Sequence, residues 1–204
     1  MSRARTTELE AVNRILRSLK KSPVTTLDSS FGEDGHVREI LDAAARDLLC
    51  QRWSFNTDRL TIKADNNGDM RLPDSVLVAK ILRRDRWRGL DRYTLRGTRV
   101  WDRQANTYRF EPGTELTVDV THWLDWNDRP EYANLLIIAI AARDANRETL
   151  GDAQADAVLE RRVQTVQAIF EATEAAVNPA NAFDVHSDDL SDGDPRRAVT
   201  GYIW

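Results

Sequence analysis

The chain has 204 residues, 41% of them hydrophobic and 30% charged, with a formal net charge of −4. This length predicts one domain, or one domain with an insertion, and the slightly acidic balance gives no global sign of nucleic-acid binding. The longest apolar run, 135–142, is far shorter than the roughly 20 residues that span a bilayer. No apolar segment follows Arg3 and Arg5, so we expect neither a signal peptide nor a membrane segment. The single cysteine, Cys50, fits a reducing compartment such as the cytoplasm.

The stretch Thr7–Leu27 predicts a capped amphipathic helix followed by a proline turn. Thr7 and Glu10 have the spacing of a capping box, in which each side chain accepts a hydrogen bond from the other residue's backbone N–H. Pro23 is expected to end the helix. The apolar residues fall on one helical face: Leu9, Val12, Ile15, Leu16 and Leu19.

A second helix is predicted from about Asp34 to Gln51. Cys50, beside two leucines near its end, is interpreted as a small buried apolar residue. Trp53 and Phe55 follow at once in the string Trp-Ser-Phe-Asn, and we interpret both aromatic side chains as core anchors.

Between residues 59 and 121 the pattern changes to the alternation of half-buried strands. Leu60, Ile62 and Ala64 alternate with polar residues, and the string from Asp65 to Gly68 predicts a tight hairpin turn. Further short strands are expected at 70–72, 76–82, 93–95, 99–101 and 116–120. We interpret this stretch as a small antiparallel β region inserted between helices.

Helical patterns return after residue 122. Asp128 is the predicted N-cap of a third helix, with Glu131 three residues later. The run 135–142 is apolar on every side, which predicts a helix at the centre of the bundle. Gly151 breaks the pattern and Asp152 can cap a fourth helix to about residue 176. Its expected buried stripe is Leu159, Val163, Val166 and Phe170.

These elements predict an α+β fold. An antiparallel bundle of about four helices is formed by 1–58 and 122–178, with the small antiparallel β region inserted at 59–121. Residues 179–204 have no hydrophobic period and are rich in aspartate, which predicts an extended acidic C-terminal arm.

No metal site or cofactor is predicted. The three histidines are far apart in the sequence, and a metal site needs three or four converging ligands. A calcium loop that starts at Asp65 would need glycine at its sixth position and glutamate at its twelfth, where the chain has Met70 and Val76.

One alternative function is a polysaccharide-degrading enzyme. Asp119, Asp125 and Asp128 are close in sequence, and glycoside hydrolysis uses two carboxylates on either side of the scissile bond. Such an enzyme would need a cleft in which these acids converge, with a raised pKa on one of them. Asp128 already has the capping role described above.

The segment Arg83–Arg109 contains nine arginines against three aspartates, with tryptophans and tyrosines interleaved. Three interpretations stay open: a protein–protein contact, a solvated hairpin whose arginines pair with nearby aspartates, and a nucleic-acid surface. The protein–protein contact is favoured, because arginine, tryptophan and tyrosine are the residue types enriched as anchors at such contacts. A stand-alone DNA-binding protein that uses this hairpin remains a second alternative function.

Three strings carry a resemblance to a known family. The helix and turn of Glu8–Leu27 are similar to the opening of the tail tubular protein A family, the adaptors of short-tailed bacteriophages. Trp53–Asn56 resembles the family's signature after the second helix, and Asp128–Gly151 resembles its capped third helix. The matching positions of the first string are Glu8, Leu9, Ala11, Val12, Asn13, Ile15, Leu16, Pro23, Val24, Thr26 and Leu27.

The resemblance implies a virion structural protein and not an enzyme. Family members form a dodecameric ring beneath the portal protein and receive the tail nozzle protein, tail tubular protein B, while tail fibres attach near that junction. Genomic DNA passes through the ring during ejection. We therefore expect assembly in the host cytoplasm and a final location in the virion tail.

Two interfaces are expected. The C-terminal arm is expected to dock on the portal or a neighbouring subunit, because aromatic residues and flexible segments that order on binding suit such contacts. The arginine-rich segment is expected to meet the nozzle or a neighbouring subunit. The arm residues are Asp188, Asp189, Tyr202, Ile203 and Trp204, and the residues of the second interface are Arg83, Arg84, Arg86, Trp87, Arg88 and Arg92.

Overall fold

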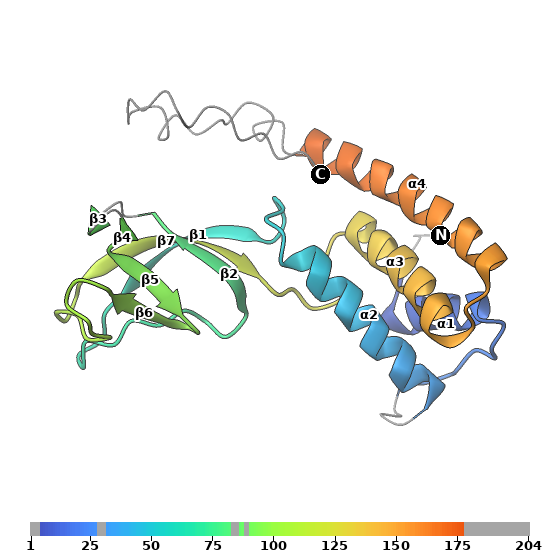
Figure 1. Ribbon diagram of the computed structural model, residues 1–204, viewed down its shortest axis with the longest axis horizontal. Coiled ribbons are helices and arrows are strands. Elements are labelled where there is room, and N and C mark those ends of the chain that lie inside the picture. Colours follow the sequence, from blue (N-terminus) through green and yellow to red (C-terminus); the bar gives the residue numbers. More distant parts are fainter. Residues whose placement is uncertain (1–4, 28–31, 83–85, 88–89, 178–204) are drawn as a thin grey trace.

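A computed structural model of the chain describes residues 5–27, 32–82, 86–87 and 90–177, with backbone alone for 86, 87 and 90. Figure 1 shows two lobes side by side, one made of helices and one of strands. The described chain confirms the predicted α+β class, with four α-helices and antiparallel strands between the second and third. No helix in these residues is both long and apolar enough to cross a membrane.

The helical lobe packs three helices around a central one. The four helices are α1 (Glu8–Ser18), α2 (Glu33–Leu49), α3 (Glu131–Thr149) and α4 (Ala153–Val177). As its apolar run predicts, α3 is the central helix, and α1, α2 and α4 all pack against it. The predicted stripe of α4 is buried at Val163, Val166 and Phe170 and half-buried at Leu159.

The first helix begins as predicted and ends earlier than predicted. Thr7 and Glu10 form the capping box, with N–H to side-chain oxygen distances of 3.0 and 3.2 Å. The helix ends at Ser18, and not at Pro23, because Lys20 adopts a φ of 60°. The N–H groups of Lys21 and Lys20 then donate to the carbonyls of Leu16, at 2.9 Å, and Arg17, at 3.0 Å, and so satisfy two free carbonyl groups of the last turn.

Asn13 explains why the proline turn is folded back onto α1. Its side-chain amide donates to the carbonyl of Val24 at 2.9 Å, and its side-chain oxygen accepts from the N–H of Val24 at 2.7 Å. This pair of hydrogen bonds lets a polar side chain occupy the buried face of the helix. The family string at Glu8–Leu27 is thus one packed unit in this chain.

The string Trp53–Asn56 joins the two lobes. Asn56 is buried and donates to the carbonyl of Leu49 at 2.8 Å, so it caps the end of α2. Trp53 lies edge-on against Phe170 of α4, with ring centroids 4.6 Å apart, and Phe55 also meets that ring. Both aromatic residues are half-buried against the helical core, in agreement with their predicted role as anchors.

The buried carboxylate of Glu174 completes this joint. It accepts hydrogen bonds from the N–H of Ser54 and, at 2.9 Å, from the hydroxyl of Tyr132. Burial and this hydrogen bond raise the pKa of Tyr132, so it stays a neutral donor. The last turns of α4 are therefore held against both α3 and the segment that leads into the β lobe.

The β lobe contains one sheet and two ribbons. The sheet has the order β1 (Thr57–Lys63), β7 (Glu115–His122), β2 (Val76–Ile81), with both pairs antiparallel. The ribbons are β3 (Arg86–Trp87) with β4 (Leu90–Asp91), and β5 (Tyr93–Arg96) with β6 (Arg99–Asp102). A second apolar core, with Met70, Val100 and Leu116 fully buried, lies beneath them.

Several local predictions are wrong. The turn at Asp65–Gly68 forms, but β1 pairs with β7 and not with the strand that follows the turn. Residues 70–72 form only an isolated bridge from Arg71 to Arg99. Cys50, predicted to be buried, is exposed and occupies the C-cap of α2.

The prediction that Asp128 is the N-cap of α3 is also wrong. It is exposed, and α3 begins at Glu131 after Pro130. The carboxylate of Glu131 accepts from the N–H and the hydroxyl of Thr6, so it connects α3 to the start of α1. The segment before α3 is organised by Arg129, whose buried guanidinium lies 4.8 Å from the ring of Trp123.

We predict that Gly68→Ala lowers the free energy of unfolding by about 2–3 kcal/mol. Gly68 has a φ of 76°, and an added Cβ would overlap the carbonyl oxygen of Phe110. Gly97→Ala is the matched control, because Gly97 has a φ of 62° but open space around it, so only the backbone strain of about 1 kcal/mol remains. Urea denaturation measures both, and equal losses would contradict the close approach of Phe110.

Candidate interaction surface on the β lobe

The described residues of the arginine-rich segment Arg83–Arg109 form two ribbons and not one hairpin. Arg86 and Trp87 belong to the strand β3, which pairs with β4, and Arg92 lies between β4 and β5. The other predicted interface residues of this segment, Arg83, Arg84 and Arg88, lie outside the described residues, as do those of the C-terminal arm: Asp188, Asp189, Tyr202, Ile203 and Trp204.

Two of the arginines are held by aspartates inside the lobe. Arg92 donates to the buried carboxylate of Asp102 from Nε at 3.0 Å and from Nη2 at 2.8 Å. Although burial favours a higher pKa for Asp102, hydrogen bonds from Arg92 and from the N–H groups of Ala105 and Gln104 hold that pKa below its ordinary value. Arg92 thus stabilises the loop after β6 and is not a free cation.

Arg99 has a similar internal role. It donates to Asp69 from Nε at 2.9 Å, and the same carboxylate accepts from Arg71 at 2.6 Å. The hydrogen bond from Arg71 lowers the pKa of Asp69 most, and Arg99 adds to the effect. These contacts tie the ribbon β5–β6 to the segment after β1.

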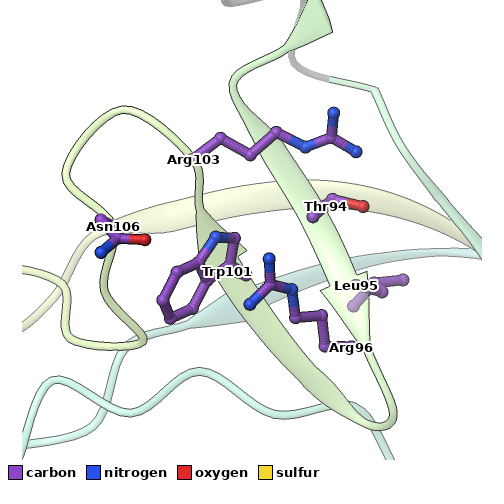
Figure 2. A pocket seen from close by; sticks show the side chains of 6 residues that line it. All are labelled: Thr94, Leu95, Arg96, Trp101, Arg103 and Asn106. Atoms are coloured by element: carbon purple, nitrogen blue, oxygen red, sulfur yellow. The ribbon is translucent and has the colours of Figure 1, made fainter.

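A hollow of about 480 Å³ lies on the outer face of the ribbon β5–β6. The guanidinium of Arg96 stacks on Trp101, with its central carbon 4.1 Å from the ring centroid, and Arg103 lies across the ribbon (Figure 2). Within the described part of the chain, neither guanidinium forms an ion pair with a carboxylate. The side chains that line the hollow are Thr94, Leu95, Arg96, Trp101, Arg103 and Asn106.

The rings behind the hollow give it a fixed shape. Trp101 meets Tyr108 edge-on at 4.5 Å between centroids, and Arg99 lies over the face of Tyr108. Stacking on an aromatic ring restrains a guanidinium while its N–H groups remain able to donate. Two uncompensated guanidinium groups beside a half-buried indole can bind a carboxylate or phosphate together with an apolar group.

The residues of this hollow were not singled out from the sequence as site residues. The sequence signal for them is the alternation of residues along the two strands. Thr94 pairs with Trp101, and Arg96 pairs with Arg99. Pairs in this register share one face of an antiparallel ribbon. The pairing of β5 with β6 brings these residues together, and the sequences of the two short strands do not specify that pairing.

The three candidate catalytic acids do not form a carboxylate pair. Asp125 and Asp128 are exposed in the link before α3, whereas Asp119 lies buried on β7. Asp119 accepts from Arg59 at 2.8 Å and from Arg52 at 3.0 Å, and the hydrogen bond from Arg59 is the main cause of its lowered pKa. A general acid needs the opposite shift, so Asp119 is a structural residue that connects the sheet to the end of α2.

We predict that the free energy of unfolding falls as pH drops below about 4, partly through Asp119. The folded state lowers the pKa of Asp119 below 3.8, so its ion pairs stabilise the fold above that pH and are lost as pH falls through the lowered pKa. Asp119→Asn should cost roughly 1–3 kcal/mol at pH 7 and should flatten the acid dependence. Urea titrations of both proteins at pH 7, pH 5 and pH 3 measure these free energies of unfolding. If the variant loses as much stability between pH 5 and pH 3 as the natural chain does, this role of Asp119 is contradicted.

Comparison with known proteins identifies the family. The family model described as "Tube: Tail tubular protein" matches residues 9–180, which include the whole β lobe and all four helices except Glu8, the first residue of α1. No curated protein matches the chain. Because the match covers most of the sequence, the chain belongs to the tail tubular protein family and is a structural component of a phage virion tail.

Proposed function

We propose that this tail protein is the adaptor that joins the portal protein to the tail nozzle protein of a short-tailed phage. Its copies form a dodecameric ring below the portal, tail tubular protein B attaches beneath the ring, and tail fibres bind near that junction. Genomic DNA passes through the ring during ejection, and the ring assembles in the host cytoplasm.

The observation that carries this proposal is the family match over residues 9–180. It is supported by the resemblance of Glu8–Leu27 and Trp53–Asn56 to the tail tubular protein A strings, which fold in this chain as an Asn13-clamped turn and an Asn56-capped helix end. A subunit with different surfaces on its two lobes suits a head-to-tail contact, and such contacts close into rings when the rotation between copies permits.

The proposed portal contact is the acidic arm, 182–204, which follows α4. Glu174 fixes the last turns of α4 through Ser54 and Tyr132, and the arm follows these turns in the sequence. Acidic segments without a hydrophobic period can order on binding and cover a large partner surface. Its aromatic residues Tyr202 and Trp204 belong to the types that anchor interfaces.

We predict that deletion of residues 182–204 abolishes binding to purified portal dodecamers. Light scattering of portal mixed with the full chain should show the added mass of a ring, and the deletion variant should add none. The variant should keep the unfolding midpoint of the full chain, because both apolar cores lie within the first 177 residues. A deletion variant that still adds the mass of a ring would contradict the arm as the portal contact.

The proposed nozzle contact includes the strand β3. We predict that Arg86→Glu combined with Arg88→Glu leaves the ring on the portal intact and blocks attachment of the nozzle, since reversed charges oppose an acidic partner surface. Arg92 is left unchanged, because its ion pair with Asp102 is needed inside the lobe. Electron microscopy of particles assembled with the variant provides the measurement, with Arg14→Glu on α1 as the control. Normal tailed particles from the β3 variant would contradict this contact.

A further inference from the structure

We propose that the hollow of Arg96, Trp101 and Arg103 docks into the groove between α2 and α3 of a second copy of this chain. This inference rests on the proposed ring and specifies the two surfaces that join neighbouring subunits. The contact is head-to-tail, because one surface lies on the β lobe and the other on the helical lobe.

The receiving surface is an acidic groove of about 240 Å³ between α2 and α3. The α2 wall presents carboxylates at Glu39 and Asp47 on either side of the exposed Ala43. The spacing of four residues between each carboxylate and Ala43 places them on one helical face. The α3 wall contributes Asp144 and Glu148, and His36 lies 3.8 Å from the carboxylate of Glu148.

The charges of the two surfaces are complementary. Glu39 and Asp47 are exposed and, within the described residues, have no cation partner, just as Arg96 and Arg103 have no carboxylate partner there. Each surface therefore presents two free charges of one sign, separated by an apolar group. Complementary charges around a central aromatic anchor are the arrangement that gives an interface its register and its specificity.

The apolar parts match as well. Trp101 projects beside Arg96 on the ribbon (Figure 2), and the floor of the groove consists of Ile40, Ala43 and Ala44. Small alanine side chains leave room for an indole ring between the two acidic walls. Desolvation of an indole against apolar side chains is a typical source of binding free energy at the centre of an interface.

One molecule cannot satisfy both surfaces itself. The groove runs along α2 from His36 to Asp47 in the helical lobe, whereas β5 and β6 lie in the other lobe (Figure 1). Complementary surfaces on opposite lobes join successive copies in one direction. A repeated contact of this kind closes into a ring or continues as a filament.

Duplex DNA fits the hollow less well than a protein does. Arg92, which lies just before β5, and Arg99, on β6, are neutralised by Asp102 and Asp69. Phosphate binding along a duplex relies on a continuous row of cations. Two cations around an indole match a compact acidic site on a protein better.

A charge-swap experiment tests the contact. Variant A carries Arg96→Glu and Arg103→Glu, and variant B carries Glu39→Arg and Asp47→Arg. Light scattering on portal dodecamers should show that each variant alone forms no ring, with self-association at least about 100-fold weaker than that of the natural chain. An equimolar mixture of A and B should form rings again, because alternating copies then present opposite charges at every contact. A chain with all four changes should also assemble.

The control variant changes two exposed arginines outside the hollow, Arg14→Glu and Arg109→Glu, and should assemble normally. Loss of assembly in this control, or no rescue in the mixture, would overturn the proposal. Duplex DNA binding that is lost in variant A, together with normal ring formation, would assign the hollow to nucleic acid instead and would also overturn it.

A second measurement separates this inference from the proposed function. Ala43→Cys and Asn106→Cys chains, both with Cys50→Ser, are mixed without portal and oxidised. The expected product is a disulfide-linked dimer of the two different chains. The yield of this dimer should fall at least tenfold when the changes of variant A are added to the Asn106→Cys chain. If this dimer forms while no ring forms on the portal, the adaptor function fails and the contact stands. If the ring forms while variant A assembles normally, the contact fails and the adaptor function stands.

Discussion

The burial of α3 is the constraint on which the rest of the structure depends. This helix has apolar residues on every side, so it must be covered by other helices before the chain can be stable in water. α1 and α2 precede the β lobe in sequence and α4 follows α3, so packing around α3 draws together segments that are more than a hundred residues apart. The two ends of the β lobe are thereby brought to one side of the bundle.

The joint between the lobes combines apolar and polar contacts. Phe170 packs against Trp53 and Phe55, while Glu174, one turn later on α4, accepts hydrogen bonds from the same joint. Asp119 adds a second connection from the central strand of the sheet, through Arg52, to the end of α2. The two lobes are therefore held together by several independent contacts.

Internal pairing decides which arginines of the β lobe are available to a partner. Arg92 and Arg99 are matched by buried or half-buried aspartates, which leaves Arg96 and Arg103 around Trp101 as the free cations of the hollow. The pairing of Arg92 and Arg99 with aspartates agrees with the solvated-hairpin interpretation for these two residues, whereas a protein contact through Arg96 and Arg103 stays a proposal. The same separation into paired and unpaired charges distinguishes Glu39 and Asp47 from the acids that hold the fold together.

The sequence by itself determined the α+β class, the capping box at Thr7, the central position of α3 and the buried stripe of α4, because these follow from local hydrogen bonding and hydrophobic period. It also carried the family, through strings such as Trp53–Asn56. Only the tertiary structure decided that β1 pairs with β7, that Asp119 is held by two arginines and that Arg96 stacks on Trp101. Those contacts join residues far apart in the chain or on opposite strands, and strand pairing and charge pairing depend on the whole packed arrangement rather than on local pattern.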